Sequence, residues 1–145
     1  MPLHTGEGGL APLHLESGAD IVFQVGTAKY GVRTAGGRLD EAKLAAIAQH
    51  RQVRMFEIKL SQGAKPGKGG VLPGAKVTPA IARVRGIPEG QDSLSPNRHP
   101  EITDVLVAWT LWLGCGRSRE SPRGSNSSSA AMPGCKPSAM KLSAE

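Results

Sequence analysis

The feature that most constrains the fold is a strand, a helix and a second strand in close succession. Ile21 to Val25 (IVFQV) is a short β-branched and aromatic run closed by glycine, which is typical of a strand. Asp40 is a favourable N-cap for a helix that ends near His50, and Val53 to Leu60 then alternates as a second strand. This order predicts an α/β fold, in which the helix crosses between two parallel strands in the right-handed sense.

The second strand has two chemically different faces. Phe56, Ile58 and Leu60 share one face, whereas Glu57 and Lys59 lie on the other. Lys59 therefore stands at the C-terminal end of the strand, on the face opposite the aromatic and aliphatic side chains. In a (β/α)8 barrel, functional groups gather on the loops that follow such strand ends.

The segment after this strand, residues 61–77 (SQGAKPGKGGVLPGAKV), is predicted to be a long loop rich in glycine and lysine. Glycines let backbone N–H groups approach an anion, and lysines supply charge for phosphate or carboxylate. A surface loop with solvated lysines is the alternative, and the spacing does not fit a Walker A motif. A short helix should follow, since Thr78 and Pro79 suit its start and Gly86 its end after Arg85.

Composition limits the core that the chain can build. Glycine (19) and proline (11) are frequent among the 145 residues, and aromatic residues make up 3%. The longest apolar run, Val105 to Leu113, is far shorter than the roughly 20 residues that span a bilayer. The N-terminus also lacks the regions of a signal peptide. We therefore expect a thin core, no membrane span and a cytoplasmic location.

The formal net charge of +6 raises the question of nucleic-acid binding. The basic residues are dispersed, and the few aromatic side chains are too scattered to form a base-stacking platform. Cys115 and Cys135 form neither a CxxC pair nor a ligand set with the histidines, so no metal site is predicted. A small basic protein that binds anions or nucleic acid through the Gly/Lys loop stays the alternative hypothesis.

The composition changes abruptly near Asp104. Both tryptophans and both cysteines lie after this point, and Gly114 to Glu145 is dominated by serine, glycine, proline and arginine, which is typical of disorder. We therefore treat residues 1–104 as one coherent domain and residues 105–145 as an unrelated, disordered tail.

The domain formed by residues 1–104 resembles a known protein family along most of its length. MFEIKLSQGAKPGKGGVLPGAKVTPAIARVRGIPEGQDSLSPNRHPEI, Met55 to Ile102, is similar to the central FMN-binding domain of glutamate synthase and of the FMN-binding glutamate synthase family proteins. HTGEGGL (His4 to Leu10) and VFQVGTAKYGVR (Val22 to Arg33) resemble the same domain in the same order. Because the family domain is a TIM barrel of several hundred residues, the resemblance implies a partial (β/α)8 barrel.

The resemblance also implies an oxidoreductase with flavin chemistry. Electrons arrive at FMN, and the reduced flavin passes a hydride to 2-iminoglutarate, formed from 2-oxoglutarate and ammonia, to give L-glutamate. The ligands so implied are FMN and 2-oxoglutarate or glutamate. The identity of the electron donor stays open.

Individual positions acquire roles through the same resemblance. Gln24 in FQVG, with Lys59 and Gln62 in KLSQG, match family positions around the flavin ring. Lys65 in QGAKPG and Arg85 in ARVR match positions that contact the 2-oxoglutarate carboxylates, for which an ammonium and a guanidinium fork are suited.

Two further positions concern the catalytic assignment. Glu7 in TGEGG matches a glutamate near the flavin edge and is, with Lys65, the catalytic candidate. Lys68 departs from the family pattern, which has glutamate there, so Lys68 receives no role.

Large parts of the family domain have no counterpart in this sequence. They include the later barrel strands, the Gly-rich loop for the FMN phosphate, the cysteines of the iron–sulfur centre and the N-terminal half of the barrel. The run VLVAWTLWL and the Ser/Arg/Pro/Gly-rich end look like a coding sequence read out of register. We therefore expect a frameshifted or truncated product that is inactive in isolation, with a genuine tail as the alternative.

Overall fold

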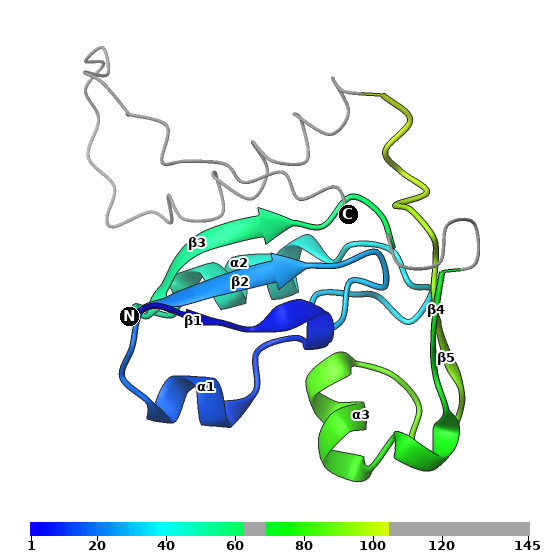
Figure 1. The fold of residues 1–145 in the computed structure, drawn as a ribbon, viewed down its shortest axis with the longest axis horizontal. Coiled ribbons are helices and arrows are strands. Elements are labelled where there is room, and N and C mark those ends of the chain that lie inside the picture. Colours follow the sequence, from blue (N-terminus) through cyan, green and yellow to red (C-terminus); the bar gives the residue numbers. More distant parts are fainter. Residues whose placement is uncertain (63–68, 105–145) are drawn as a thin grey trace.

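A parallel sheet is the central feature of this protein, whose computed structural model describes residues 1–62 and 69–104. The sheet has the order β1-β2-β3 (Figure 1) and consists of β1 (Leu3–His4), β2 (Ile21–Val25) and β3 (Val53–Ile58). β2 runs parallel to both neighbours, with Phe23 opposite Phe56 and Gln24 opposite Glu57. The predicted parallel pairing of the two longer strands is confirmed, and the fold is α/β.

Helix α2 (Glu41–Gln49) connects β2 to β3, as the sequence predicts (Figure 1). The side chain of Asp40 accepts a hydrogen bond from the backbone N–H of Lys43 at 3.1 Å. This bond satisfies one of the N–H groups that a helix start leaves without an intrahelical partner. Leu44 and Ala48 are the buried residues of the helix, one turn apart.

The apolar core lies between α2 and one face of the sheet. Ile21, Phe23 and Val25 alternate along β2 with half-buried residues, so every second side chain of this strand enters the core. Phe23 meets Phe56 edge-on, with ring centroids 5.8 Å apart. The fully buried cluster consists of Ile21, Phe23, Val25, Val32, Leu44 and Val53.

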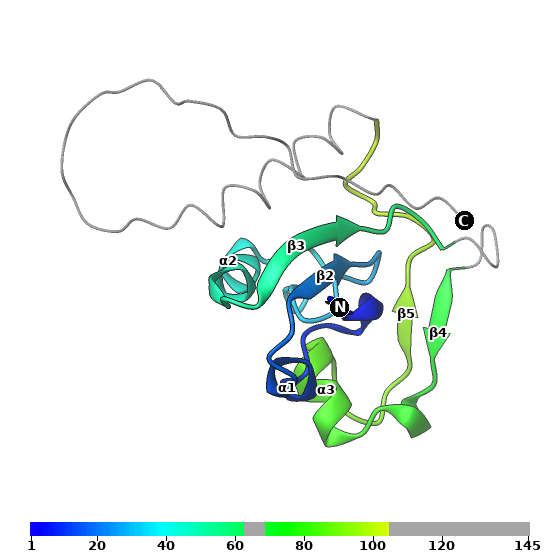
Figure 2. The ribbon, with the colours of Figure 1, turned by 60° about the vertical axis from the view of Figure 1, so that its left-hand side comes forward.

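A second, smaller sheet lies beside the first and corrects one prediction. β4 (Gly70–Leu72) pairs antiparallel with β5 (Ser93–Ser95), and a 3-10 turn, η2 (Gly74–Lys76), follows β4 (Figure 2). The expectation of one continuous loop over residues 61–77 was therefore wrong. A three-residue strand is too short to show an alternating pattern, and its hydrogen-bonding partner comes much later in the chain.

Helix α3 (Pro79–Arg85) lies between β4 and β5 in the sequence and has the predicted ends. Thr78 accepts a hydrogen bond from Ile81 N at 3.4 Å, and Gly86 ends the helix in the left-handed conformation (φ 68°). The carbonyl of Arg85 accepts a hydrogen bond from Gly31 N at 3.1 Å. This bond ties the end of α3 to the loop that follows β2.

Three short elements at the N-terminal side were not predicted: β1, the 3-10 turn η1 (Gly6–Gly8) and helix α1 (Pro12–Glu16). Within residues 1–62 and 69–104, the structure contains no helix with the length and apolarity needed to cross a membrane. The predicted disorder of residues 105–145 concerns a segment outside the described residues.

Candidate functional site

Three polar side chains from two distant segments meet at the C-terminal edge of the parallel sheet. Glu7 lies in η1 directly after β1, and Lys59 and Gln62 follow β3. Lys59 Nζ lies 3.4 Å from Glu7 Oε2 and donates to Gln62 Oε1 at 3.0 Å, while Gln62 Nε2 donates to Glu7 Oε2 at 2.8 Å. We call these three residues the Glu7 cluster. Glu7 and Lys59 keep 35% and 29% of their side-chain surface exposed, so a ligand can reach them.

The backbone explains why the Glu7 cluster forms at this place. The C-terminal ends of parallel strands meet at one edge of a sheet, and Lys59 N extends the ladder by donating to Val25 O at 3.1 Å. Gly26 follows β2, and a Cβ at this position would lie 2.7 Å from the Cβ of Glu7. Only glycine therefore permits this approach of Glu7. Thr27 completes the contacts, because its Oγ1 accepts a hydrogen bond from Gln62 Nε2 at 3.2 Å.

Gln24 lies nearby on β2, in a separate polar group. Its Nε2 donates to Glu57 Oε1 across the strand pair, and Glu57 Oε2 lies 3.3 Å from His4 Nε2. Alternation along the chain after Glu57 places Lys59 on the same face, yet no hydrogen bond in the described part of the chain joins Gln24 to the Glu7 cluster. Sequence alternation placed Glu57 on the same face of the strand as Lys59, whereas His4 was given no role in the site.

Arg85, the last residue of α3, is held over the ring of Tyr30. The guanidinium carbon lies 4.8 Å from the ring centroid, which is cation–π geometry. Tyr30 is buried, and its hydroxyl is hydrogen-bonded to Ser93 Oγ at 2.9 Å. A Cβ on Gly8 would lie 3.5 Å from Arg85 Nη2, so the guanidinium borders η1. Among the described residues Arg85 has no carboxylate partner, which leaves a positioned cation beside the turn that carries Glu7.

Lys65, the remaining predicted site residue, lies outside the described residues. The structure therefore brings together Glu7, Lys59 and Gln62, places Gln24 in a separate polar group on β2, and sets Arg85 beside Gly8 of η1.

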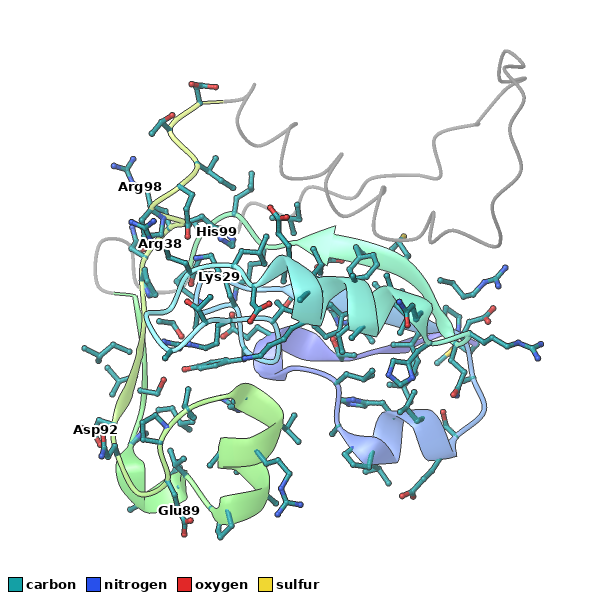
Figure 3. All side chains as sticks on the ribbon, turned by 180° about the vertical axis from the view of Figure 1, so that it is seen from behind. Lys29, Arg38, Glu89, Asp92, Arg98 and His99 are labelled. Atoms are coloured by element: carbon teal, nitrogen blue, oxygen red, sulfur yellow. The ribbon has the colours of Figure 1, made fainter. Side chains whose placement is uncertain are left out.

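A buried group that the sequence did not predict supports the backbone beneath Lys59. His99 is 1% exposed, and its Nε2 lies 2.8 Å from the carbonyl oxygen of Lys59. Lys29 is 2% exposed, adopts a left-handed φ of 55°, and pairs with Glu101 at 3.0 Å. Figure 3 labels Lys29 and His99, which lie near each other. Single residues in loops carry no periodic signal, so only the family motifs around them could have drawn attention to them.

Burial sets the protonation of this group. Desolvation lowers the pKa of His99, the positive charge of Lys29 lowers it further, and the Lys59 carbonyl and Glu101 act in the opposite direction. Partial burial alone would raise the pKa of Glu101, but its own backbone N–H and Lys29 outweigh this, and the pKa is lowered overall. His99 is therefore held neutral, donating from Nε2 to Lys59, and Glu101 is held ionised.

The lowered pKa of His99 predicts an acid-sensitive fold. The unfolded chain takes up a proton at His99 near the ordinary pKa of about 6.5, whereas the folded chain does so only at lower pH. The free energy of unfolding should therefore be fully retained above about pH 7 and fall as the pH is lowered through the ordinary histidine pKa, until the folded chain also takes up the proton. Urea denaturation at several pH values measures this slope.

Two variants test whether His99 causes this pH dependence of the free energy of unfolding. His99→Gln can still donate to the Lys59 carbonyl but does not titrate, so its stability should depend less on pH in this range. His50→Gln, at an exposed position, should keep the wild-type slope. An unchanged slope in His99→Gln would contradict the assignment.

The comparisons with known proteins agree on one family. Residues 2–106 match the family model described as the conserved region in glutamate synthase. The glutamate synthase large subunit-like protein YerD of Bacillus subtilis is 40% identical over 102 residues, which cover 70% of this chain and 19% of YerD. The archaeal glutamate synthase (NADPH) of Methanocaldococcus jannaschii is 44% identical over 102 residues, covering 70% of this chain and 17% of that protein.

The similarity extends to a more distant relative of the same description. A glutamate synthase large subunit-like protein of Rhizobium meliloti is 32% identical over 99 residues, covering 68% of this chain and 20% of the relative. The chain thus spans a fifth or less of the length of these three relatives. Since the family model matches most of the sequence, this chain belongs to the glutamate synthase family.

Proposed function

We propose that residues 1–104 form part of the site in which a glutamate synthase-type oxidoreductase binds FMN and 2-oxoglutarate and forms L-glutamate. The observation that carries this proposal is the Glu7 cluster, which joins Glu7 to Lys59 and Gln62 at the C-terminal edge of a parallel sheet. Functional groups of (β/α)8 barrels lie at this edge, and the three strands with α2 suit part of such a barrel. The barrel itself belongs to the proposal.

The donor set of the Glu7 cluster fits the polar edge of a flavin. A flavin ring presents carbonyl oxygens and an N–H group, and the cluster offers an ammonium, an amide and a carboxylate to meet them. FMN, when bound, would supply the hydride-transfer chemistry. The residues of the chain orient the ring: Lys59 places a positive charge at its edge, Glu7 holds that lysine, and Gln24 contributes an amide from the neighbouring strand.

Arg85 suits a carboxylate of 2-oxoglutarate. Its guanidinium is fixed by the buried ring of Tyr30 and has no acidic partner in the described ranges, so its fork is available to an anion. The second carboxylate is proposed to meet Lys65.

Because the chain spans a fifth or less of its relatives, we propose ligand binding but no turnover by the chain alone. Residues 105–145 are proposed to be a separate unit produced by a change of reading frame.

Fluorescence titration of FMN with the full chain tests this proposal. Saturable quenching is expected, and Lys59→Met should weaken binding about tenfold, because it removes a charged hydrogen-bond donor. Lys76→Met is the matched control, since Lys76 is exposed in η2 and should leave the affinity unchanged. Absence of FMN binding by the wild-type chain, or equal effects of the two substitutions, would sink the proposal.

The alternative of a small basic protein that binds nucleic acid makes a different prediction for the same chain. RNA binding would be tight at low ionic strength and weaken steeply with added salt, because it depends on phosphate neutralisation. Such binding without any affinity for FMN would favour the alternative.

A further inference from the structure

A cavity of about 550 Å³ is lined in part by the loop that follows β2. The walls come from this loop, from the turn before α2, and from the chain segment that begins with β5; they include Lys29, Arg33, Arg38, Leu94 and Glu101. Among the lining residues in the described ranges, only Thr27 also contacts the Glu7 cluster. Its volume lies in the range of small-molecule sites.

The charges around the cavity are unbalanced. Lys29 and Glu101 pair with each other at 3.0 Å, so they neutralise one another. Arg33 and Arg38 have no carboxylate partner among residues 1–62 and 69–104, and Arg38 is exposed. Figure 3 shows Arg38 at the same end of the molecule as Lys29, and away from the acidic Glu89 and Asp92. Two guanidinium groups without a carboxylate partner in the described ranges therefore border one cavity.

Arg33 is held at the wall of the cavity, with its guanidinium carbon 6.0 Å from the centroid of the Tyr30 ring. Its Nε is buried and has no hydrogen-bond partner within the described residues. The backbone cannot turn this group away easily, since the Arg33 carbonyl accepts from Lys43 Nζ at 2.7 Å and Thr34 N donates to Arg38 O at 2.9 Å.

We propose that this cavity binds a small phosphomonoester. Its phosphoryl group lies between Arg33 and Arg38, because guanidinium forks bind phosphate oxygens with two parallel hydrogen bonds. Its organic part lies against the apolar wall formed by Leu94, Pro96 and Pro100. Leu94 is 69% exposed, which a ligand body at this position would reduce. This site is separate from the proposed flavin and 2-oxoglutarate site.

Phenyl phosphate is a suitable probe, because it combines a phosphomonoester with a compact apolar group. In a titration of the full chain followed by amide resonances, shifts should concentrate in residues 33–38 and 94–101. Phenol, which lacks the phosphate, should not bind, and inorganic phosphate should bind more weakly than phenyl phosphate. Absence of saturable binding, or shifts confined to η1 and Arg85, would overturn the proposal.

Arg38→Gln is the informative variant, since this side chain is exposed and its replacement should leave the fold intact. We expect it to weaken phenyl phosphate binding about tenfold, the loss typical of one charged hydrogen-bonding group. Arg51→Gln is the matched control: Arg51 is also exposed but lies before β3, outside the cavity, and its replacement should not change the affinity. Equal losses in both variants would reduce the effect to net charge and refute the site.

The variants also separate this proposal from the flavin site. FMN is itself a phosphomonoester, so riboflavin, which carries the flavin ring without the phosphate, is the probe that separates the two sites. Arg38→Gln should leave riboflavin binding unchanged, and Lys59→Met should leave phenyl phosphate binding unchanged. Loss of both ligands in either variant would show a single shared site and contradict the separation.

Discussion

Replacing Phe23 by alanine is expected to lower the free energy of unfolding by about 3–5 kcal/mol. Phe23 is fully buried at the centre of β2 and packs with the cluster around Leu44 and Val53. Its removal leaves a cavity that a core of few large side chains cannot fill. Because whole domains are stable by only about 5–15 kcal/mol, this loss is a large fraction of the total. Urea denaturation followed by circular dichroism measures it.

Phe56→Ala provides the comparison for the Phe23 substitution. Phe56 is only half-buried, although it contacts Phe23 edge-on, so its truncation should cost less. The double variant should fall short of the sum of the two single losses by about 0.5–1.5 kcal/mol, because the aromatic contact is counted in both. A greater loss at Phe56 than at Phe23 would show that the core does not centre on β2.

The second large effect is expected at Lys29. Lys29→Ala should lower the free energy of unfolding by about 2 kcal/mol, because it removes a buried alkyl chain and breaks the 3.0 Å pair with Glu101. The loss stays below that of a fully buried pair, since the Glu101 side chain is 40% exposed and water can solvate it. Denaturation at neutral pH, where Glu101 is ionised, measures this effect.

The left-handed backbone at Lys29 allows the loss of the ion pair to be separated from the effect of backbone strain. With a φ of 55°, any residue with a Cβ is strained there, and glycine is not. Lys29→Gly should therefore be more stable than Lys29→Ala by about 1 kcal/mol, although both lose the ion pair. Lys76→Ala, at an exposed position, should stay within about 0.5 kcal/mol of wild type. A glycine variant less stable than the alanine variant would contradict the strain.

The helices and strands that could be predicted are those whose sequence signals lie within or directly beside the element. β2, α2 and α3 were predicted because their signals act over a few neighbouring residues: the β-branched and aromatic run IVFQV closed by glycine, the Asp40 cap, and Thr78, Pro79 and Gly86 at the ends of α3. The parallel pairing of β2 and β3 followed from their order around a helix. By contrast, β4 and β5 have only three residues each, and each depends on the other for its hydrogen bonds.

The candidate site shows the same difference between what local sequence motifs indicate and what long-range contacts decide. Glu7, Gln24, Lys59, Gln62, Lys65 and Arg85 were identified through family motifs, which mark positions but give no distances. The contact of Glu7 with Gln62 spans 55 positions of sequence, and that of Tyr30 with Ser93 spans 63. No local pattern encodes such pairs.

The sequence by itself determined the strand–helix–strand order, the helix ends and the family, because each depends on short-range preferences or on a linear motif. Only the tertiary structure decided that Lys59 meets Glu7, that Tyr30 supports Arg85, and that Arg33 keeps a buried N–H without a described partner. The physical reason is that hydrogen bonds, ion pairs and burial depend on distances in space, which packing of the whole chain sets.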